Sequence, residues 1–172
     1  MTQMHEYAVE VAWTGNLGSG TSGYRDFTRD HDITGPHTPH KPAIRGTADP
    51  SFQGYAGRWN PEELLVASLS QCHMLWYLVL CARAGIIATS YRDHARGTMT
   101  RNPDGGGQFS SVTLSPRVTV TAPAPPGLDD ITHDVDRHRV LAERLHEDAH
   151  RLCFIANSVN FPVHLVPTIT VV

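Results

Sequence analysis

The chain has 172 residues, of which 40% are hydrophobic and 18% charged, and its formal net charge is −3. This length and composition are typical of one globular domain that can bury a core. No run of Lys or Arg is present, which excludes the basic footprint of a nucleic-acid-binding protein. We therefore predict a single domain over residues 1–172 with no nucleic-acid partner.

The targeting signals and the cysteine content indicate a compartment. Residues 1–10 are polar and then alternate, unlike a signal peptide. The longest apolar stretch, residues 64–87, is interrupted by Ser, Gln, His and Arg, which favours a buried helix over a membrane span. Three cysteines without an export signal favour a reducing cytoplasm. We expect a cytoplasmic protein with no membrane partner.

The N-terminal third predicts short strands joined by turns. Residues 7–13 alternate in polarity, which is typical of a half-buried strand. The side chains on its apolar face are Tyr7, Val9, Val11 and Trp13. A Gly/Ser/Thr turn over 15–23 leads to a returning strand over 24–33, and a Pro- and His-rich loop over 35–52 holds a short strand near 43–47.

A long helix is predicted over residues 61–84. Asn60 is a good N-cap, Pro61 suits the first helical position, and Gly85 ends the pattern. Apolar residues recur in steps of three and four along it. They are Leu65, Leu69, Cys72, Trp76 and Val79. The other faces are also apolar, so we expect a central helix covered on several sides.

The C-terminal half predicts a hairpin, a helix and a final strand. The hairpin strands cover 86–100 and 109–121, and a Pro/Gly turn lies between them. A proline-rich bend follows at 122–127, then a helix over 134–152 and a strand over 162–172. This order of strands and helices is an α+β pattern.

Two cysteines lie in distinctive sequence frames. The first frame is Asn60-Pro61-Glu62-Glu63-Leu64-Leu65, with Cys72 ten residues after Glu62. The second is Cys153-Phe154-Ile155-Ala156-Asn157-Ser158. From spacing alone, each is most simply a buried core cysteine, and Cys81 likewise. Together, the two frames resemble the cysteine motifs of the OsmC/Ohr family, the osmotically inducible and organic hydroperoxide resistance proteins.

The resemblance implies a fold and an activity. Members are cytoplasmic, stress-response thiol peroxidases, and their antiparallel strands surround a long buried central helix. They form intertwined, obligate homodimers with two active sites at the subunit interface. The expected function is reduction of organic hydroperoxides, and of hydrogen peroxide as a second substrate. The expected partners are the hydroperoxide and an external dithiol reductant, for which a lipoyl-type dithiol is one candidate.

The resemblance also implies residue roles. Cys72 matches the peroxidatic cysteine and Cys153 the resolving cysteine, so the two are expected to form a disulfide. Glu62 matches the glutamate of the Asn-Pro-Glu element, with Glu63 as an adjacent competitor.

The catalytic arginine of the family has an altered sequence context in this chain. The family places it in a Gly-Arg-Asp turn between the first strands, and here Gly23-Tyr24-Arg25-Asp26 has one residue inserted. Arg25 is the best match, with Arg29 and Arg58 as alternatives. An arginine beside a thiol lowers the thiol pKa and orients a peroxide oxygen, and a paired glutamate fixes its guanidinium.

Two other functions stay open on the residues. His146, His150 and Cys153 follow spacings of four and three and can share one helical face, as zinc ligands do. Without a nameable fourth ligand, a polar helix face explains them more simply, so we expect no metal and no other cofactor. A non-catalytic protein could instead bind a small hydrophobic ligand at an apolar dimer interface. His73 points about 100° away from Cys72 on a helix, which argues against a Cys–His pair.

Overall fold

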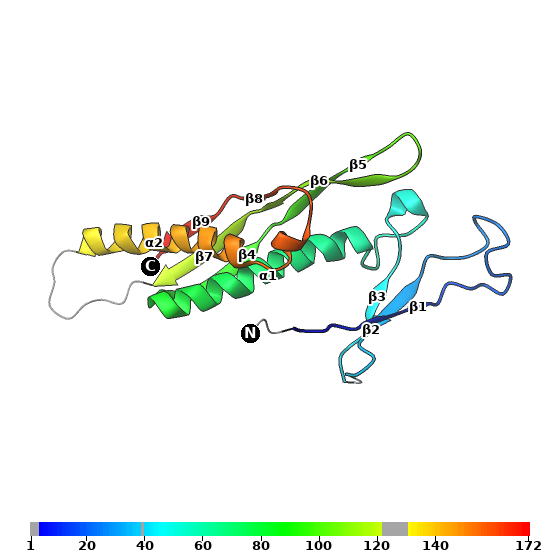
Figure 1. Cartoon of the computed structure of the whole chain (residues 1–172), viewed down its shortest axis with the longest axis horizontal. Helices are drawn as coiled ribbons and strands as arrows, with labels where there is room; N and C mark the ends of the chain where they lie inside the picture. The colour runs from blue at the N-terminus through cyan, green and yellow to red at the C-terminus, as the bar shows by residue number, and fades with distance from the viewer. Residues whose placement is uncertain (1–3, 39, 122–130) are drawn as a thin grey trace. The chain divides into compact units, whose positions relative to one another are not determined.

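The computed structural model describes residues 4–38, 40–121 and 131–172 (Figure 1). The chain divides into two compact units, Met1–Leu64 and Leu65–Val172, and each is described by itself. The predicted bend at 122–127 lies outside the described residues. A single domain over the whole chain stays a prediction.

The first unit contains a small antiparallel sheet of order β1-β2-β3. Its strands are β1 (Glu10–Trp13), β2 (His31–Thr34) and β3 (Ile44–Gly46), followed by a short 3₁₀ helix at Pro50–Phe52. Val11 of β1 pairs with Ile33 of β2, and Ile33 pairs with Ile44 of β3. The short strand expected near 43–47 is confirmed, whereas the returning strand begins later than expected.

The half-buried face predicted for residues 7–13 is wrong for the single chain. Tyr7 is 91% exposed, Val11 is 61% exposed and Trp13 is 44% exposed. Alternation identifies a face of a strand, but it does not say what covers that face. These apolar side chains are left open to water.

Helix α1 (Pro61–Ala84) begins and ends where the sequence predicts. At its start, the Glu63 amide donates to Asn60 Oδ1 at 2.8 Å and the Asn60 amide donates to Glu63 Oε2 at 3.2 Å, forming a capping box. At its end, Gly85 has a φ of 74°, and the Ile86 amide donates to the Cys81 carbonyl at 2.9 Å. This is a Schellman end, which favours glycine at the left-handed position.

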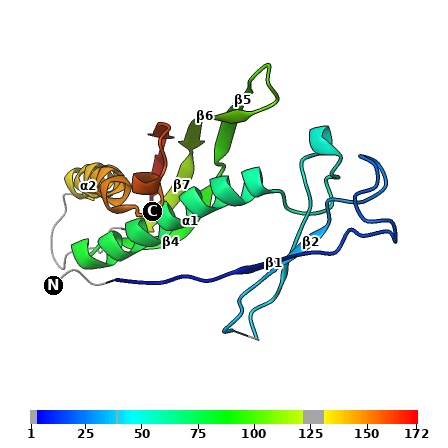
Figure 2. The same ribbon diagram turned by 45° about the vertical axis from the view of Figure 1, so that its right-hand side comes forward.

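The second unit combines two three-stranded sheets with α1 and α2 (Ile131–Leu152) (Figure 2). One sheet has the order β4-β7-β9 and the other β5-β6-β8. The strands are β4 (Ile87–Asp93), β5 (Arg96–Arg101), β6 (Gly107–Leu114), β7 (Pro116–Thr121), β8 (Val163–Leu165) and β9 (Thr168–Val171), and a 3₁₀ helix covers Ala156–Ser158. β8 and β9 add in parallel, with Val112 opposite Val163 and Val118 opposite Ile169. The predicted α+β class is confirmed.

The predicted hairpin is correct in its pairing but wrong in its continuity. Its two long strands are each split, near Asp93 and at Ser115. The Asp93 carboxylate accepts the Ser115 amide at 2.7 Å and the Ser70 hydroxyl of α1 at 2.6 Å. Pro116 follows and has no amide hydrogen to donate. At this point a side-chain hydrogen bond therefore replaces the backbone hydrogen bonds between the strands. The alternation of polar and apolar residues in the sequence does not reveal this.

The buried stripe of α1 differs from the predicted one. Its fully buried members recur every four residues and are Leu69, His73, Tyr77 and Cys81. Tyr77 and Cys81 pack against Ala142, Leu145 and Ala149 of α2, which runs beside α1 (Figure 1). Cys81 is a core cysteine, as expected.

The opposite side of α1 is open in the single chain. Leu75 is 58% exposed and Val79 is 43% exposed, so the expected cover on several sides is wrong for one chain. By length and composition alone, α1 could also cross a membrane. Its buried stripe instead packs on α2 and the sheets, as in the core helix of a soluble protein.

Candidate active site

The two cysteines singled out in the sequence are brought together. Cys72 lies half-buried on α1, and Cys153 is buried just after α2 ends. Their thiols lie close enough to interact with each other, and neither is in a disulfide. The Ala156 amide also points at Cys153 Sγ, at 3.4 Å. The fold thus brings two thiols near each other from positions 81 residues apart in sequence, as disulfide formation requires.

The environment of Cys153 fixes its protonation. Burial, followed by the hydrogen bond and charge interaction with Cys72, raises the pKa of the Cys153 thiol to about 11. Cys153 is therefore a protonated thiol near neutral pH.

The segment that carries Cys153 is held by several contacts. The Cys153 amide donates to the His150 carbonyl at 3.2 Å, and the Asn157 amide donates to the Cys153 carbonyl at 3.0 Å. Phe154 packs edge-on against Trp76 of α1, with ring centroids 5.6 Å apart. Trp76 lies one helical turn beyond Cys72, so aromatic surface borders the thiol pair.

A buried pair of histidines joins α1 to α2. His73 follows Cys72 on α1, and His146 precedes Cys153 by seven residues on α2. His73 Nε2 and His146 Nδ1 are 2.9 Å apart, and their rings are nearly parallel. Tyr77 stacks on His146 with centroids 3.8 Å apart. All three side chains are fully buried.

Burial keeps both histidines neutral. It is the main cause that lowers the pKa of His73 to about 4 and of His146 to about 3, helped by charge from His150 and His73 respectively. A neutral pair needs one ring to donate and the other to accept. The sequence analysis did not predict this contact, although His73 shares a spacing of four residues with Leu69, Tyr77 and Cys81.

The metal-site alternative gains no support from this geometry. Across residues 4–38, 40–121 and 131–172, no three His, Cys, Asp or Glu side chains are placed to hold a metal ion. His146 Nδ1 is engaged by His73, and Cys153 is engaged by Cys72.

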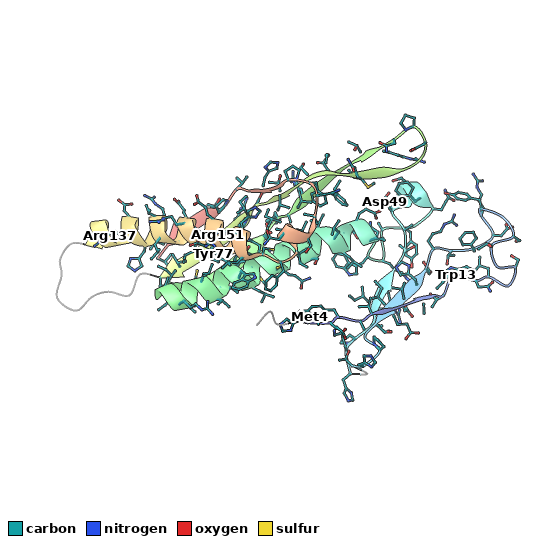
Figure 3. All side chains as sticks on the ribbon, in the orientation of Figure 1. Met4, Trp13, Asp49, Tyr77, Arg137 and Arg151 are labelled. Carbon is teal, nitrogen blue, oxygen red and sulfur yellow. The ribbon has the colours of Figure 1, made fainter. Side chains whose placement is uncertain are left out.

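In the first unit, Glu62 lies on a cavity of about 410 Å³. Glu62 Oε2 is buried and has no hydrogen-bond partner in the described part of the chain. Arg29 lines the same cavity, donates to the Phe27 carbonyl at 2.9 Å and stacks over the Phe27 ring at 4.2 Å. Other side chains in its wall include Trp13 and Asp49, both labelled in Figure 3. The cavity wall thus holds two carboxylates, Glu62 and Asp49, and an arginine among aromatic side chains.

The other sequence candidates are placed differently. Arg25 is exposed on the turn and is not part of the cavity wall. Arg58 pairs with Asp30 at 3.6 Å. Glu63 is occupied in the capping box with Asn60. Of the three candidate arginines, Arg29 shares a cavity with Glu62.

The family model described as OsmC-like protein matches residues 54–167, so the chain belongs to the OsmC-like family. This range contains Glu62 and both cysteines. It confirms the family to which the two cysteine frames pointed. No match is found among curated proteins.

Solved structures support the same fold. An OsmC-like protein of unknown function from Vibrio cholerae is 28% identical over 95% of this chain and 99% of its own, with a TM-score of 0.75. An organic hydroperoxide resistance protein from Elizabethkingia anophelis is 17% identical over 98% of this chain and 99% of its own (TM-score 0.61). The organic hydroperoxide resistance protein OhrB of Bacillus subtilis is 18% identical over 95% and 98% (TM-score 0.56). The last two identities are low and show the fold alone.

Proposed function

We propose that the protein is a cysteine-based peroxidase that reduces organic hydroperoxides, with hydrogen peroxide as a second substrate. The observation that carries the proposal is that the Cys72 and Cys153 thiols lie close enough to interact. Family membership supports a role in hydroperoxide resistance. The aromatic pair of Trp76 and Phe154 beside the thiols favours a substrate with an apolar part.

The proposed cycle has three balanced steps. The Cys72 thiolate attacks the outer peroxide oxygen, the O–O bond breaks, and Cys72 becomes a sulfenic acid. The alkoxide that is released takes a proton from solvent and leaves as the alcohol. The Cys153 sulfur then attacks Cys72, the S–O bond breaks, and the thiol proton leaves with the hydroxide as water. An external dithiol, of which the lipoyl type is one candidate, reduces the Cys72–Cys153 disulfide and is itself oxidised.

Cys72 and Cys153 have different tasks in this cycle because their environments differ. Cys72 is half-buried, so a peroxide can reach it, whereas Cys153 is buried and held as a protonated thiol. Only after Cys72 has taken up oxygen does Cys153 gain an electrophile to attack. A buried resolving thiol next to the first sulfur also limits further oxidation of Cys72.

We propose that Arg29 supplies the guanidinium that orients the peroxide oxygen, and that Glu62 supplies the carboxylate that fixes this guanidinium. Arg25 is the match by sequence, but Arg29 is the arginine that shares a cavity with Glu62. The stacking of Arg29 over Phe27 limits the orientations of its planar group. Glu62 Oε2, buried without a partner in the described residues, is available to pair with that group.

We further propose a cytoplasmic homodimer. Large apolar side chains are exposed on β1 of one unit and on α1 of the other, including Val11 and Leu75. Exposed apolar surface of this kind is typical of an interaction surface. We expect the dimer to bury well over about 2,000 Å², as obligate interfaces do. Sedimentation of a monomer at micromolar concentration would contradict this part.

The test of the activity is peroxide consumption by the purified protein. With a dithiol such as dihydrolipoamide as reductant, we expect turnover of cumene hydroperoxide that is faster than turnover of hydrogen peroxide. A monothiol reductant serves as the comparison, since a protein disulfide is reduced more completely by a dithiol. A protein that binds the hydroperoxide but does not consume it would be the hydrophobic-ligand carrier instead.

A further inference from the structure

The His73–His146 hydrogen bond lies between the two helices that carry the thiols. Cys72 precedes His73 on α1, and Cys153 follows His146 by two helical turns at the end of α2. Tyr77 of α1, labelled in Figure 3, stacks on the same histidine ring. One α2 side chain therefore contacts two consecutive positions of the buried α1 stripe.

This contact is specific in a way that the surrounding apolar packing is not. If α2 shifted along α1, Leu145 and Ala149 would still bury apolar surface. A hydrogen bond between two ring nitrogens 2.9 Å apart cannot slide, because both nitrogens would be left unpaired in a dry core. His73 and His146 are 0% and 1% exposed, so water cannot replace the lost partner.

From this arrangement we propose that His73 and His146 are positioning residues, whose hydrogen bond sets the register of α1 against α2 and thereby holds Cys153 in bonding range of Cys72. The inference rests on the proposed function only for its biological consequence, the speed of sulfenic acid resolution. The effective concentration of one thiol toward the other, on which the inference depends, can be measured without peroxide.

The geometric demand explains why register matters. A disulfide needs Cα atoms about 4.4–6.8 Å apart and a narrow range of sulfur dihedrals. The Cys153 segment is fixed to α2 through the His150 carbonyl, so a shift of α2 carries the thiol with it. Misplacement of about 1 Å can cost roughly 100-fold in a reaction between two positioned groups.

The first test is the disulfide equilibrium of Cys72 and Cys153 in glutathione redox buffers, followed by intact mass. His73→Leu removes the hydrogen bond at similar volume, whereas His73→Gln places an amide where Nε2 stood. We expect His73→Leu to lower the disulfide equilibrium constant at least tenfold, a shift of about 30 mV, and His73→Gln to restore most of it. An equilibrium unchanged in His73→Leu would overturn the proposal.

A second pair of variants works from the other helix. His146→Leu removes the acceptor or donor at Nδ1, and His146→Asn keeps an amide near that position. We expect the same loss and the same partial rescue. If His73→Leu does not fold, the comparison moves to His73→Asn, which is polar but too short, against His73→Gln. Equal disulfide equilibria in those two variants would count against the proposal.

Val120→Ala is the matched control for stability alone. Val120 is fully buried on β7, in the same core, and carries no hydrogen bond between side chains. We expect this variant to melt earlier and to keep the wild-type disulfide equilibrium. A disulfide equilibrium that follows melting temperature across all variants would show that the histidines act through stability only.

The second test measures the lifetime of the sulfenic acid after one equivalent of cumene hydroperoxide. We expect His73→Leu to form the sulfenic acid at the wild-type rate and to resolve it at least tenfold more slowly, with sulfinic acid accumulating. A wild-type resolution rate in that variant would contradict the inference and leave the peroxidase proposal intact. A wild-type protein that forms no sulfenic acid would refute the peroxidase proposal. The disulfide equilibrium in glutathione buffers would then decide the positioning proposal by itself.

Discussion

The two units of the chain treat their ionisable side chains in opposite ways. In the first, the guanidinium of Arg29 and the carboxyl group of Glu62 line the wall of a cavity of about 410 Å³. In the second, His73 and His146 are fully buried and held neutral between two helices. Side chains on a cavity wall can contact a ligand, whereas fully buried side chains can contact only other parts of the protein. The comparison separates residues that we expect to act on a substrate from residues that we expect to hold the thiols.

The largest expected effect is on the thiol that begins the chemistry. Cys72→Ser should lower dithiol-dependent hydroperoxide consumption by roughly 1,000-fold or more, because a hydroxyl is a poor nucleophile at neutral pH. The folded structure should persist, since the change in volume is small. Cys81→Ala is the control, because Cys81 is a core residue packed against α2. Turnover is measured by a peroxide assay, and comparable losses in both variants would remove Cys72 from its role.

The next effect sharpens the charged side of the comparison. Arg29→Lys should lower kcat/KM by about 10- to 100-fold, because an ammonium cannot match the planar, two-point contacts of a guanidinium. Arg25→Lys, on the exposed turn, should change it less than about twofold. A greater loss in Arg25→Lys would return the catalytic role to the arginine favoured by the sequence match.

The neutral side of the comparison predicts acid sensitivity. The folded pKa values of His73 and His146, about 4 and about 3, lie below the value of about 6.5 for an unfolded chain. The unfolded state therefore binds more protons between about pH 6.5 and 4, and stability falls as the pH falls through that window. Each histidine can contribute up to about 1.4 kcal/mol per pH unit.

Chemical denaturation at several pH values measures this slope. The double variant His73→Leu/His146→Leu should flatten it, while His164→Gln, at an exposed position on β8, should leave it unchanged. The same slope in the double variant as in the unaltered chain would mean that other groups carry the acid sensitivity.

The smallest effect concerns the start of α1. Asn60→Ala removes one half of the capping box and should lower the free energy of unfolding by about 1 kcal/mol. Asn60→Asp keeps an acceptor for the Glu63 amide and should restore most of the loss. Urea unfolding measures the difference, and equal stability of all three proteins would show that the cap contributes nothing.

The sequence predicted the ends of α1 because they depend on local chemistry, and it predicted the family because the family's motifs are short sequence frames. The catalytic pairing of Cys72 and Cys153 followed from the family resemblance and stays a prediction. Asn60, Pro61 and Gly85 mark α1 through backbone hydrogen bonds within a few residues. The split of the hairpin was missed because it depends on Asp93 meeting Ser70 and Ser115 from distant positions. The buried stripe of α1 was assigned to the most apolar residues, whereas His73 is buried because His146 provides a partner. The spacing of four that His73 shares with Leu69, Tyr77 and Cys81 is present in the sequence, but nothing in the sequence identifies the partner on α2.

The central claim, that Cys72 and Cys153 act as one redox pair, is tested most directly by intact mass and peptide mapping after one equivalent of cumene hydroperoxide. We expect a loss of about two mass units and a single linked peptide containing both cysteines. A stable gain of one oxygen on Cys72, with Cys153 still a free thiol, would contradict the claim.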